Sequence, residues 1–173
     1  VASNLLDAYR AGFPEARFSI WNRSPERAQA LAKTRPDARA VTDLKAAIGS
    51  ADIICTSTMS TSPVLQGSWL QEGQHVDLIG AYRPDMREAD DQALQRARVF
   101  VDSFDTTLDH IGELKIPLSS GALRRADVQA DYYSERGFQR GSERDITLFK
   151  NGGGAHLDLM TARYIMQQWS SAA

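Results

Sequence analysis

The stretch HVDLIGAYRPDMREADD, residues 75–91, decides the fold class of this chain. It opens as a short apolar run, ends that run at Gly80-Ala81 and then turns polar, as a buried strand does when it leaves a sheet. A run of the same kind, ADIICTST at 51–58, precedes it, and RVFVDS at 98–103 follows it. Several of the expected strands are short continuous apolar runs that do not alternate with polar residues, although Asp77 interrupts the one within 75–91, and such runs are typical of strands buried on both faces of a parallel sheet.

Helical segments separate the expected strands along most of the chain. Ser-Pro-Glu at 24–26 has the composition of a helix start, with an N-cap serine and a proline at the first helical position, and it follows an apolar strand at 18–21. Thr42 is the expected N-cap of a helix at 43–50, and residues 123–136 are expected to form another helix. This alternation predicts an α/β fold with a Rossmann-like, doubly wound and mostly parallel sheet.

The bulk composition argues against several classes of function. The 20 Lys and Arg residues nearly balance the 22 Asp and Glu residues, and the net charge of −2 gives no electrostatic case for binding nucleic acid or an anionic membrane. No apolar run is long enough to predict a membrane span. Cys55 is the single cysteine, which excludes an internal disulfide and favours a reducing, cytoplasmic compartment. The three histidines lack metal-ligand spacing, so no metal site is expected.

Asn22-Arg23-Ser24 stands where the strand at 18–21 meets the next helix. In dinucleotide-binding folds this junction meets the adenine ribose, where an acidic residue binds the ribose hydroxyls and an arginine accommodates a 2′-phosphate. Arg23 offers a charged, forked donor, and its two neighbours offer neutral hydrogen bonds. These residues could recognise the 2′-phosphate of NADP(H), but taken alone they favour the alternative, a solvated loop arginine beside an N-cap serine.

The start of the chain bears on the same hypothesis. Val1 and Ala2 lie about 20 residues before Arg23, where the glycine-rich fingerprint of a dinucleotide fold is expected. Ala2 would be the last position of that fingerprint. We therefore expect the sequence to begin inside a larger protein, with the first strand and the essential glycines before Val1.

Four stretches together resemble the ornithine cyclodeaminase/mu-crystallin family. They are IWNRSPERA at 20–28, ADIICTST at 51–58, the G-A-x-R-P-D-x-R-E-x-D-D run at 80–91, and T-L-F-K with its small-residue turn at 147–154. Their order and spacing match, and the resemblance covers nearly the whole chain. It implies a dinucleotide-binding domain over 1–150 and a closing helix over 151–173. The helix would pack toward an N-terminal substrate and dimerisation domain outside this chain, and the protein would be a homodimer.

The family contains two kinds of chemistry. Its cyclodeaminases use NAD to convert L-ornithine into L-proline and ammonia, and they carry an aspartate where this chain has Tyr82. The branch that includes mu-crystallin and the bacterial pyrroline-2-carboxylate reductases lacks that aspartate and reduces cyclic ketimines with NADPH. Tyr82 and Arg23 therefore favour an NADP-dependent reductase of a small cyclic imino acid, of the pyrroline- or piperideine-2-carboxylate type. An NAD-dependent ornithine cyclodeaminase and a non-enzymatic NADPH-binding protein remain the alternatives.

The resemblance also implies which residues form the site. The cofactor-binding residues would be Val1, Ala2, Asn22, Arg23, Ser24, Thr56, Thr58, Met59, Leu78, Ile79, Gly80, Tyr82 and Asn151. Gly152 would approach the substrate, whereas Leu78 and Ile79 could equally be core residues. No catalytic residue is assigned. Tyr82, Asp77 and His156 are candidate proton donors, although each has a plain structural alternative. The 173 residues alone are expected to be inactive.

Overall fold

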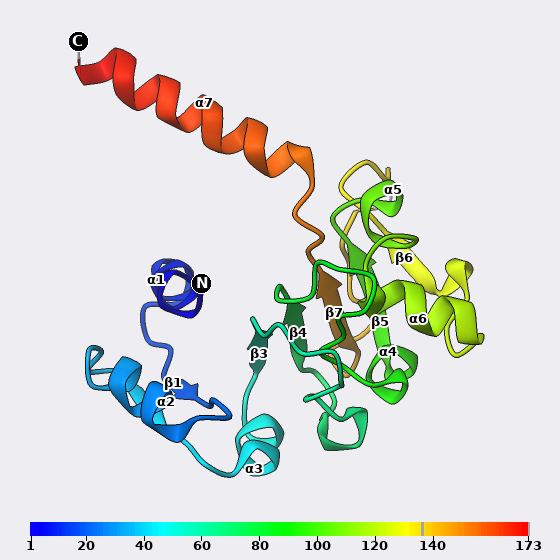
Figure 1. Ribbon diagram of the computed structural model, residues 1–173, viewed down its shortest axis with the longest axis horizontal. Helices are drawn as coiled ribbons and strands as arrows, with labels where there is room; N and C mark the ends of the chain where they lie inside the picture. Colours follow the sequence, from blue (N-terminus) through cyan, green and yellow to red (C-terminus); the bar gives the residue numbers. More distant parts are fainter. Residues whose placement is uncertain (136, 173) are drawn as a thin grey trace. The chain divides into compact units, whose positions relative to one another are not determined.

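The computed structural model describes residues 1–135 and 137–172 (Figure 1). The chain divides into two compact units, Val1–Ala51 and Asp52–Ala173. Helices alternate with parallel strands in both units, which confirms the predicted α/β class. No described helix is both long and apolar enough to cross a membrane.

The first unit pairs two short strands in parallel. Its elements are α1 (Ala2–Gly12), β1 (Phe18–Ile20), α2 (Pro25–Ala32), β2 (Ala38–Ala40) and α3 (Leu44–Gly49). Ser24 is the N-cap of α2 with a proline at the first helical position, as predicted. The expectation that Thr42 caps α3 is wrong, because the Asp43 carboxylate accepts a hydrogen bond from the Ala46 amide at 2.9 Å. A carboxylate at this position also interacts favourably with the helix dipole.

The second unit contains a five-stranded parallel sheet in the order β3-β4-β7-β5-β6. Its strands are β3 (Ile53–Thr56), β4 (His75–Leu78), β5 (Ala97–Val101), β6 (Val128–Ala130) and β7 (Ile146–Lys150). Its helices are η1 (Gly67–Trp69), α4 (Asp91–Arg96), α5 (Phe104–Thr107), α6 (Gly112–Ser120), η2 (Arg125–Asp127) and α7 (Ala155–Ala172). The last strand in the sequence, β7, lies between β4 and β5, as Figure 1 shows.

The central strands of this sheet form the core. Val76, Leu78, Val99 and Leu148 have no exposed surface, and they are the apolar residues of β4, β5 and β7 that fill the centre of the sheet. The strand ends lie in register: Thr56 pairs with Leu78, Leu78 with Lys150, and Lys150 with Val101. We call this row and the residues that follow it the carboxyl edge, which is where open α/β sheets bind their ligands.

The helix expected at 123–136 is absent from its described part, and Arg136 lies outside the described residues. The segment instead forms η2 and then the edge strand β6, which pairs with β5. The charged pattern resembles a solvated helix face. However, Val128 and Ala130 are buried while Gln129 between them is exposed, and this alternation suits a strand.

Candidate functional site

The carboxyl edge brings together residues that the sequence placed in one site. The Ile79 amide donates to the Thr56 carbonyl at 3.0 Å, and the Asn151 amide donates to the Leu78 carbonyl at 3.1 Å. Thr56, Ile79 and Asn151 therefore meet from three neighbouring strands, and all three are half-buried. The Leu78 side chain is fully buried, which agrees with the core alternative for that residue.

Glu88 ties the ends of two strands together at this edge. Its carboxylate has no exposed surface and accepts three hydrogen bonds. Oε1 accepts from the Thr58 amide at 2.5 Å, while Oε2 accepts from the Thr56 hydroxyl and the Gly80 amide, each at 2.8 Å. An ionised carboxylate is a pure acceptor, so it satisfies three donors that lie beyond the ends of β3 and β4. We call this arrangement the Glu88 brace.

Gly80 is required by the close approach of the two strand ends. A Cβ atom at this position would lie 2.1 Å from the Thr58 carbonyl oxygen and 2.5 Å from Glu88 Oε1. Real Cβ atoms do not come so close to backbone atoms, and interiors this dense leave no room for adjustment. The predicted cofactor residues Thr58 and Gly80 are thus held in one backbone arrangement by the Glu88 brace.

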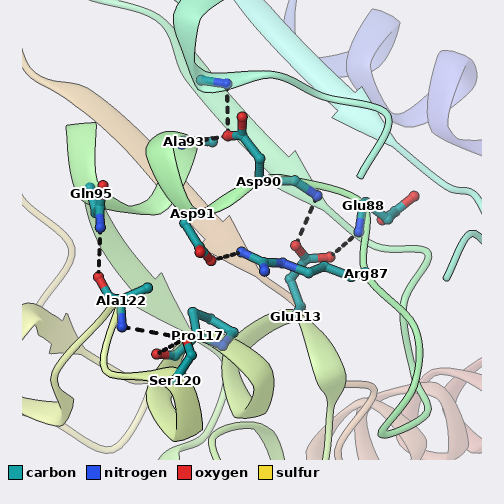
Figure 2. Close-up of polar contacts among 12 residues, drawn as sticks. Arg87, Glu88, Asp90, Asp91, Ala93, Gln95, Glu113, Pro117, Ser120 and Ala122 are labelled. Carbon is teal, nitrogen blue, oxygen red and sulfur yellow. Dashed lines mark hydrogen bonds and ion pairs between the residues drawn. The ribbon is translucent and has the colours of Figure 1, made fainter. Parts of the chain in front are cut away.

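A second buried carboxylate supports the brace from behind. The Glu113 carboxylate on α6 accepts from the Glu88 amide at 2.7 Å and from the Ala89 amide at 2.9 Å (Figure 2). Burial raises the pKa of Glu113 from 4.5 to about 7, although the two amide hydrogen bonds oppose the shift. The nearby Glu88 raises the pKa further and Lys150 lowers it. Glu113 therefore titrates near neutral pH while it holds the backbone of the brace.

Lys150 contributes the buried positive charge of this region. Its side chain has no exposed surface, and Nζ donates to the Leu78 carbonyl at 3.0 Å. Burial lowers the pKa of Lys150, and Glu113, Glu88 and Asp102 oppose the shift. Sequence analysis did not single out Glu88, Glu113 or Lys150. Glu88 and Lys150 stand within the two most specific motifs of the sequence. A charged residue inside such a motif is the signal that could have pointed to them.

The rest of the R-P-D-x-R-E-x-D-D run shapes the loop that leads into α4. Asp90 caps α4 by accepting from the Ala93 amide at 2.8 Å, and the same oxygen accepts from the Gly67 amide at 2.8 Å (Figure 2). Arg87 is mostly buried and forms an ion pair with Asp91. The charged run is therefore a folded loop in which Asp90 pairs with backbone amides and Arg87 with a neighbouring carboxylate, while the buried Arg87 Nε has no hydrogen-bond partner among the described residues.

Asp102 organises the other half of the carboxyl edge. This fully buried residue follows β5, and its Oδ1 accepts from the Ser103 amide at 2.9 Å and the Thr107 hydroxyl at 2.7 Å. A Cβ at Gly152 would lie 2.5 Å from Thr107 Oγ1, so a side chain there would displace the Thr107 hydroxyl from its place beside Asp102. On the other oxygen, His156 Nε2 lies 3.9 Å from Oδ2. Gly152 and His156, both predicted site residues, therefore adjoin a carboxylate that the sequence analysis missed.

The remaining candidates of this unit are less closely held. Met59 and Tyr82 follow the ends of β3 and β4 and are 71% and 58% exposed. Asp77 lies one residue before the end of β4, and its Oδ2 is 3.9 Å from Cys55 Sγ. Burial, followed by the charge of Asp77, raises the pKa of the Cys55 thiol to about 12. No group of His, Cys, Asp or Glu in the described residues could hold a metal ion.

In the first unit, the predicted phosphate-binding junction lies between β1 and α2. Asn22 Oδ1 accepts from the Ser24 amide at 2.9 Å, which closes a tight turn. Arg23 sits at the tip of this turn and is exposed, and the Ser24 side chain makes no capping hydrogen bond. Val1 is 77% exposed and Ala2 begins α1, 11 residues long. The junction thus presents a cation and an uncommitted hydroxyl at the start of a helix.

Comparison with known sequences extends these observations. The sequence profile of the ornithine cyclodeaminase/mu-crystallin family matches residues 1–173. The Delta(1)-pyrroline-2-carboxylate reductase of Paracoccus denitrificans is 51% identical over 173 residues, which cover 95% of this chain and 55% of that protein. Mouse ketimine reductase mu-crystallin is 37% identical over 161 residues, which cover 92% of this chain and 49% of that protein. The chain spans about half the length of the curated relatives it matches.

Solved structures show the same architecture. The Delta(1)-pyrroline-2-carboxylate reductase of Thermococcus litoralis, in complex with NADH and L-proline, matches with a TM-score of 0.85 at 26% identity. The match covers 94% of this chain and 53% of that one. An archaeal alanine dehydrogenase dimer with bound NAD matches with a TM-score of 0.89 at 26% identity, covering 99% of this chain and 55% of that one.

Proposed function

Because this chain belongs to the ornithine cyclodeaminase/mu-crystallin family, we propose that the whole protein reduces the C=N bond of a small cyclic imino acid with a nicotinamide cofactor. The observation that carries the proposal is the 51% identity, over 95% of the chain, to a pyrroline-2-carboxylate reductase. Tyr82 adds to it, because a tyrosine stands where a cyclodeaminase would place its aspartate. The substrate would be a five- or six-membered ring imine with a carboxylate on the imine carbon.

The residues of the carboxyl edge fit the nicotinamide end of such a cofactor. Gly80 and Gly152 have no side chains to obstruct it, and a Cβ at Gly153 would meet no neighbouring atom within 4 Å. Thr58 and Asn151 add polar groups on either side of them. When bound, the cofactor supplies the hydride. The chain's own contribution would be to hold these strand ends fixed through the Glu88 brace, so that the ring imine meets a rigid surface.

The phosphate-bearing cofactor is favoured by the first unit. Arg23 is exposed on a turn that Asn22 closes, and Ser24 leaves its hydroxyl uncommitted at the N-terminus of α2. A guanidinium beside a helix N-terminus suits a 2′-phosphate. The two solved structures named above carry NADH and NAD, so NAD(H) is the competing possibility. We favour NADP(H) because no carboxylate stands at Asn22, Arg23 or Ser24.

The organisation of the whole protein follows from the same proposal. Residues 1–150 would form the dinucleotide-binding domain, and the closing segment 151–173, of which Ala173 lies outside the described residues, would pack on the remainder of the protein. Large apolar side chains of α7 support this packing, since Leu159, Tyr164, Ile165 and Trp169 are each more than half exposed. We further propose a homodimer in the cytoplasm.

Two measurements on the whole protein test the function. Oxidation of NADPH with pyrroline-2-carboxylate, followed at 340 nm, is expected to proceed, whereas ammonia release from L-ornithine with NAD is not. Turnover of L-ornithine would show that the protein is an ornithine cyclodeaminase and would refute the proposed reductase function. Tight NADPH binding without turnover of either substrate would favour a non-enzymatic binding protein. Fluorescence titration with NADPH and NADH decides the cofactor, and a clear preference for NADH would overturn the role of Arg23.

A further inference from the structure

Reduction of a ring imine needs a proton on nitrogen as well as a hydride on carbon. We propose that His156 donates this proton and that Asp102 orients the imidazole for the transfer. The proposal rests on the reductase function proposed above, and it supplies the acid that the sequence left open among three candidates. The carboxyl edge of the sheet provides the geometry.

Asp102 is a built acceptor site with one oxygen turned toward the start of α7. It has no exposed surface, and Oδ1 is occupied by the Ser103 amide and the Thr107 hydroxyl. Oδ2 accepts a weak hydrogen bond from the Gly154 amide at 3.4 Å and lies 3.9 Å from His156 Nε2. The carboxylate is therefore held in place by three neighbours other than the imidazole, namely Ser103, Thr107 and Gly154. A carboxylate held in this way can select the orientation of a histidine ring.

His156 presents its two ring nitrogens to different surroundings. Its side chain is 17% exposed, and Nε2 is buried, faces Asp102 and makes no hydrogen bond within the described residues. The edge of the ring contacts Tyr132, with 5.4 Å between centroids and 74° between planes. Nδ1 lies near Gly154, where any side chain would collide with it, because a Cβ there would be 2.8 Å away. Gly154 thus leaves room for the ring beside the glycine turn that follows β7.

The proposed step balances in atoms and charge. The imine carbon receives the hydride and is reduced as the dihydronicotinamide is oxidised, and the π electron pair of the C=N bond moves to nitrogen. That nitrogen forms its N–H bond with the proton released from imidazolium Nδ1, while the Nε2 proton faces Asp102. Neutral imidazole then takes a proton from water. The Asp102 carboxylate, 3.9 Å from Nε2, would stabilise the charged ring.

The other candidate donors are less well placed. Lys150 has no exposed surface and its Nζ is held by the Leu78 carbonyl, so it cannot reach a substrate. Asp77 lies within β4, one residue before the strand ends, and is paired across to Cys55. Tyr82 is 58% exposed, and within residues 1–135 and 137–172 its hydroxyl has no carboxylate hydrogen-bond partner. His156 alone among the four combines partial exposure, a carboxylate partner and a place beside Gly152.

The test uses the whole protein with pyrroline-2-carboxylate and the cofactor it prefers. Replacing His156→Gln is expected to lower kcat by roughly 100- to 10,000-fold, the usual contribution of a general acid, while cofactor affinity stays unchanged. KM for pyrroline-2-carboxylate should change far less than kcat, because the proton is transferred only in the transition state. The matched control is His110→Gln, an exposed histidine, which should behave as wild type.

Two further variants separate catalysis from structure. Asp102→Asn should lower kcat and leave KM and cofactor affinity nearly unchanged, because the imidazolium loses its anionic partner, and a purely structural role would not confine the loss to kcat. Imidazole added to His156→Ala should restore part of kcat. An unchanged kcat in H156Q would overturn the role of His156. A wild-type protein that reduces no cyclic imino acid would instead refute the proposed function itself.

Discussion

The stability of the protein should depend on pH through Glu113. Burial raises the pKa of this carboxyl from 4.5 to about 7, so the folded protein holds a proton there in the range where the unfolded chain has lost it. The stabilisation is therefore fully present below about pH 4.5 and disappears as the pH rises through about 7. The difference between the two pKa values corresponds to about 3 kcal/mol in the free energy of unfolding.

Replacing Glu113→Gln removes the titration and also costs hydrogen bonding. Each carboxylate oxygen of Glu113 accepts from one backbone amide, from Glu88 at 2.7 Å and from Ala89 at 2.9 Å. A glutamine has a single acceptor oxygen, so one of the two buried amides would face an NH₂ group. An unsatisfied buried donor costs about 1–3 kcal/mol. The variant should thus be less stable than wild type at pH 5 and should lose the part of the pH dependence that comes from Glu113.

Urea unfolding of the whole protein between pH 5 and pH 8 measures both effects. The wild type should lose up to about 3 kcal/mol across this range through Glu113, and E113Q should lose that much less. The control is Glu72→Gln, whose carboxylate is largely exposed and should leave the slope unchanged. The same slope in wild type and E113Q would show that Glu113 does not titrate as argued.

Three other predictions concern the cofactor site and α7. Replacing Arg23→Asp should weaken NADPH binding by roughly 10- to 100-fold and leave NADH binding nearly unchanged. Replacing the exposed Arg27→Asp, the control, should alter neither affinity. An R23D variant that binds NADPH as tightly as wild type would refute the phosphate role. Replacing Gly80→Ala should lower both the Tm and the cofactor affinity because its Cβ would lie 2.1 Å from a backbone oxygen, whereas Gly12→Ala, with open space around it, should not. Replacing Trp169→Ala should lower the Tm of the whole protein if α7 packs on the remainder of it, and an unchanged Tm would show that this face stays in solvent.

Much of the fold could be predicted because the central strands carry their own signal. The runs around Ile54 and Val99 are short and mostly apolar, as expected for strands that helices cover on both faces of a sheet, and Ile54, Val76 and Val99 are all buried. The error at 123–136 arose where this signal is weak. An edge strand of three residues between charged segments has too few positions for its alternation to stand out. The local sequence pattern therefore predicted the central strands of the sheet but not the edge strand β6.

The site could be predicted in part, for a related reason. Thr56, Ile79 and Asn151 follow apolar runs, and the parallel sheet brings the ends of such runs to one edge. The groups that hold this edge together were missed. Nothing local in the sequence shows that Glu88 and Glu113 point inward, because acidic residues in polar runs are usually exposed. Asp102 was missed in the same way, although it directly follows an apolar strand.

Buried carboxylates occur here because the edge of a parallel sheet leaves backbone amides without partners. The Thr58 and Gly80 amides lie past the last ladder hydrogen bonds of β3 and β4, and both donate to Glu88. Glu113 then serves the amide of Glu88 itself. A buried amide without an acceptor destabilises the folded state. The carboxylates supply the missing acceptors at the edge of the sheet where a ligand must approach the backbone. These acids can therefore be identified only after the strands have been placed, because only then is it known which backbone amides lack a partner.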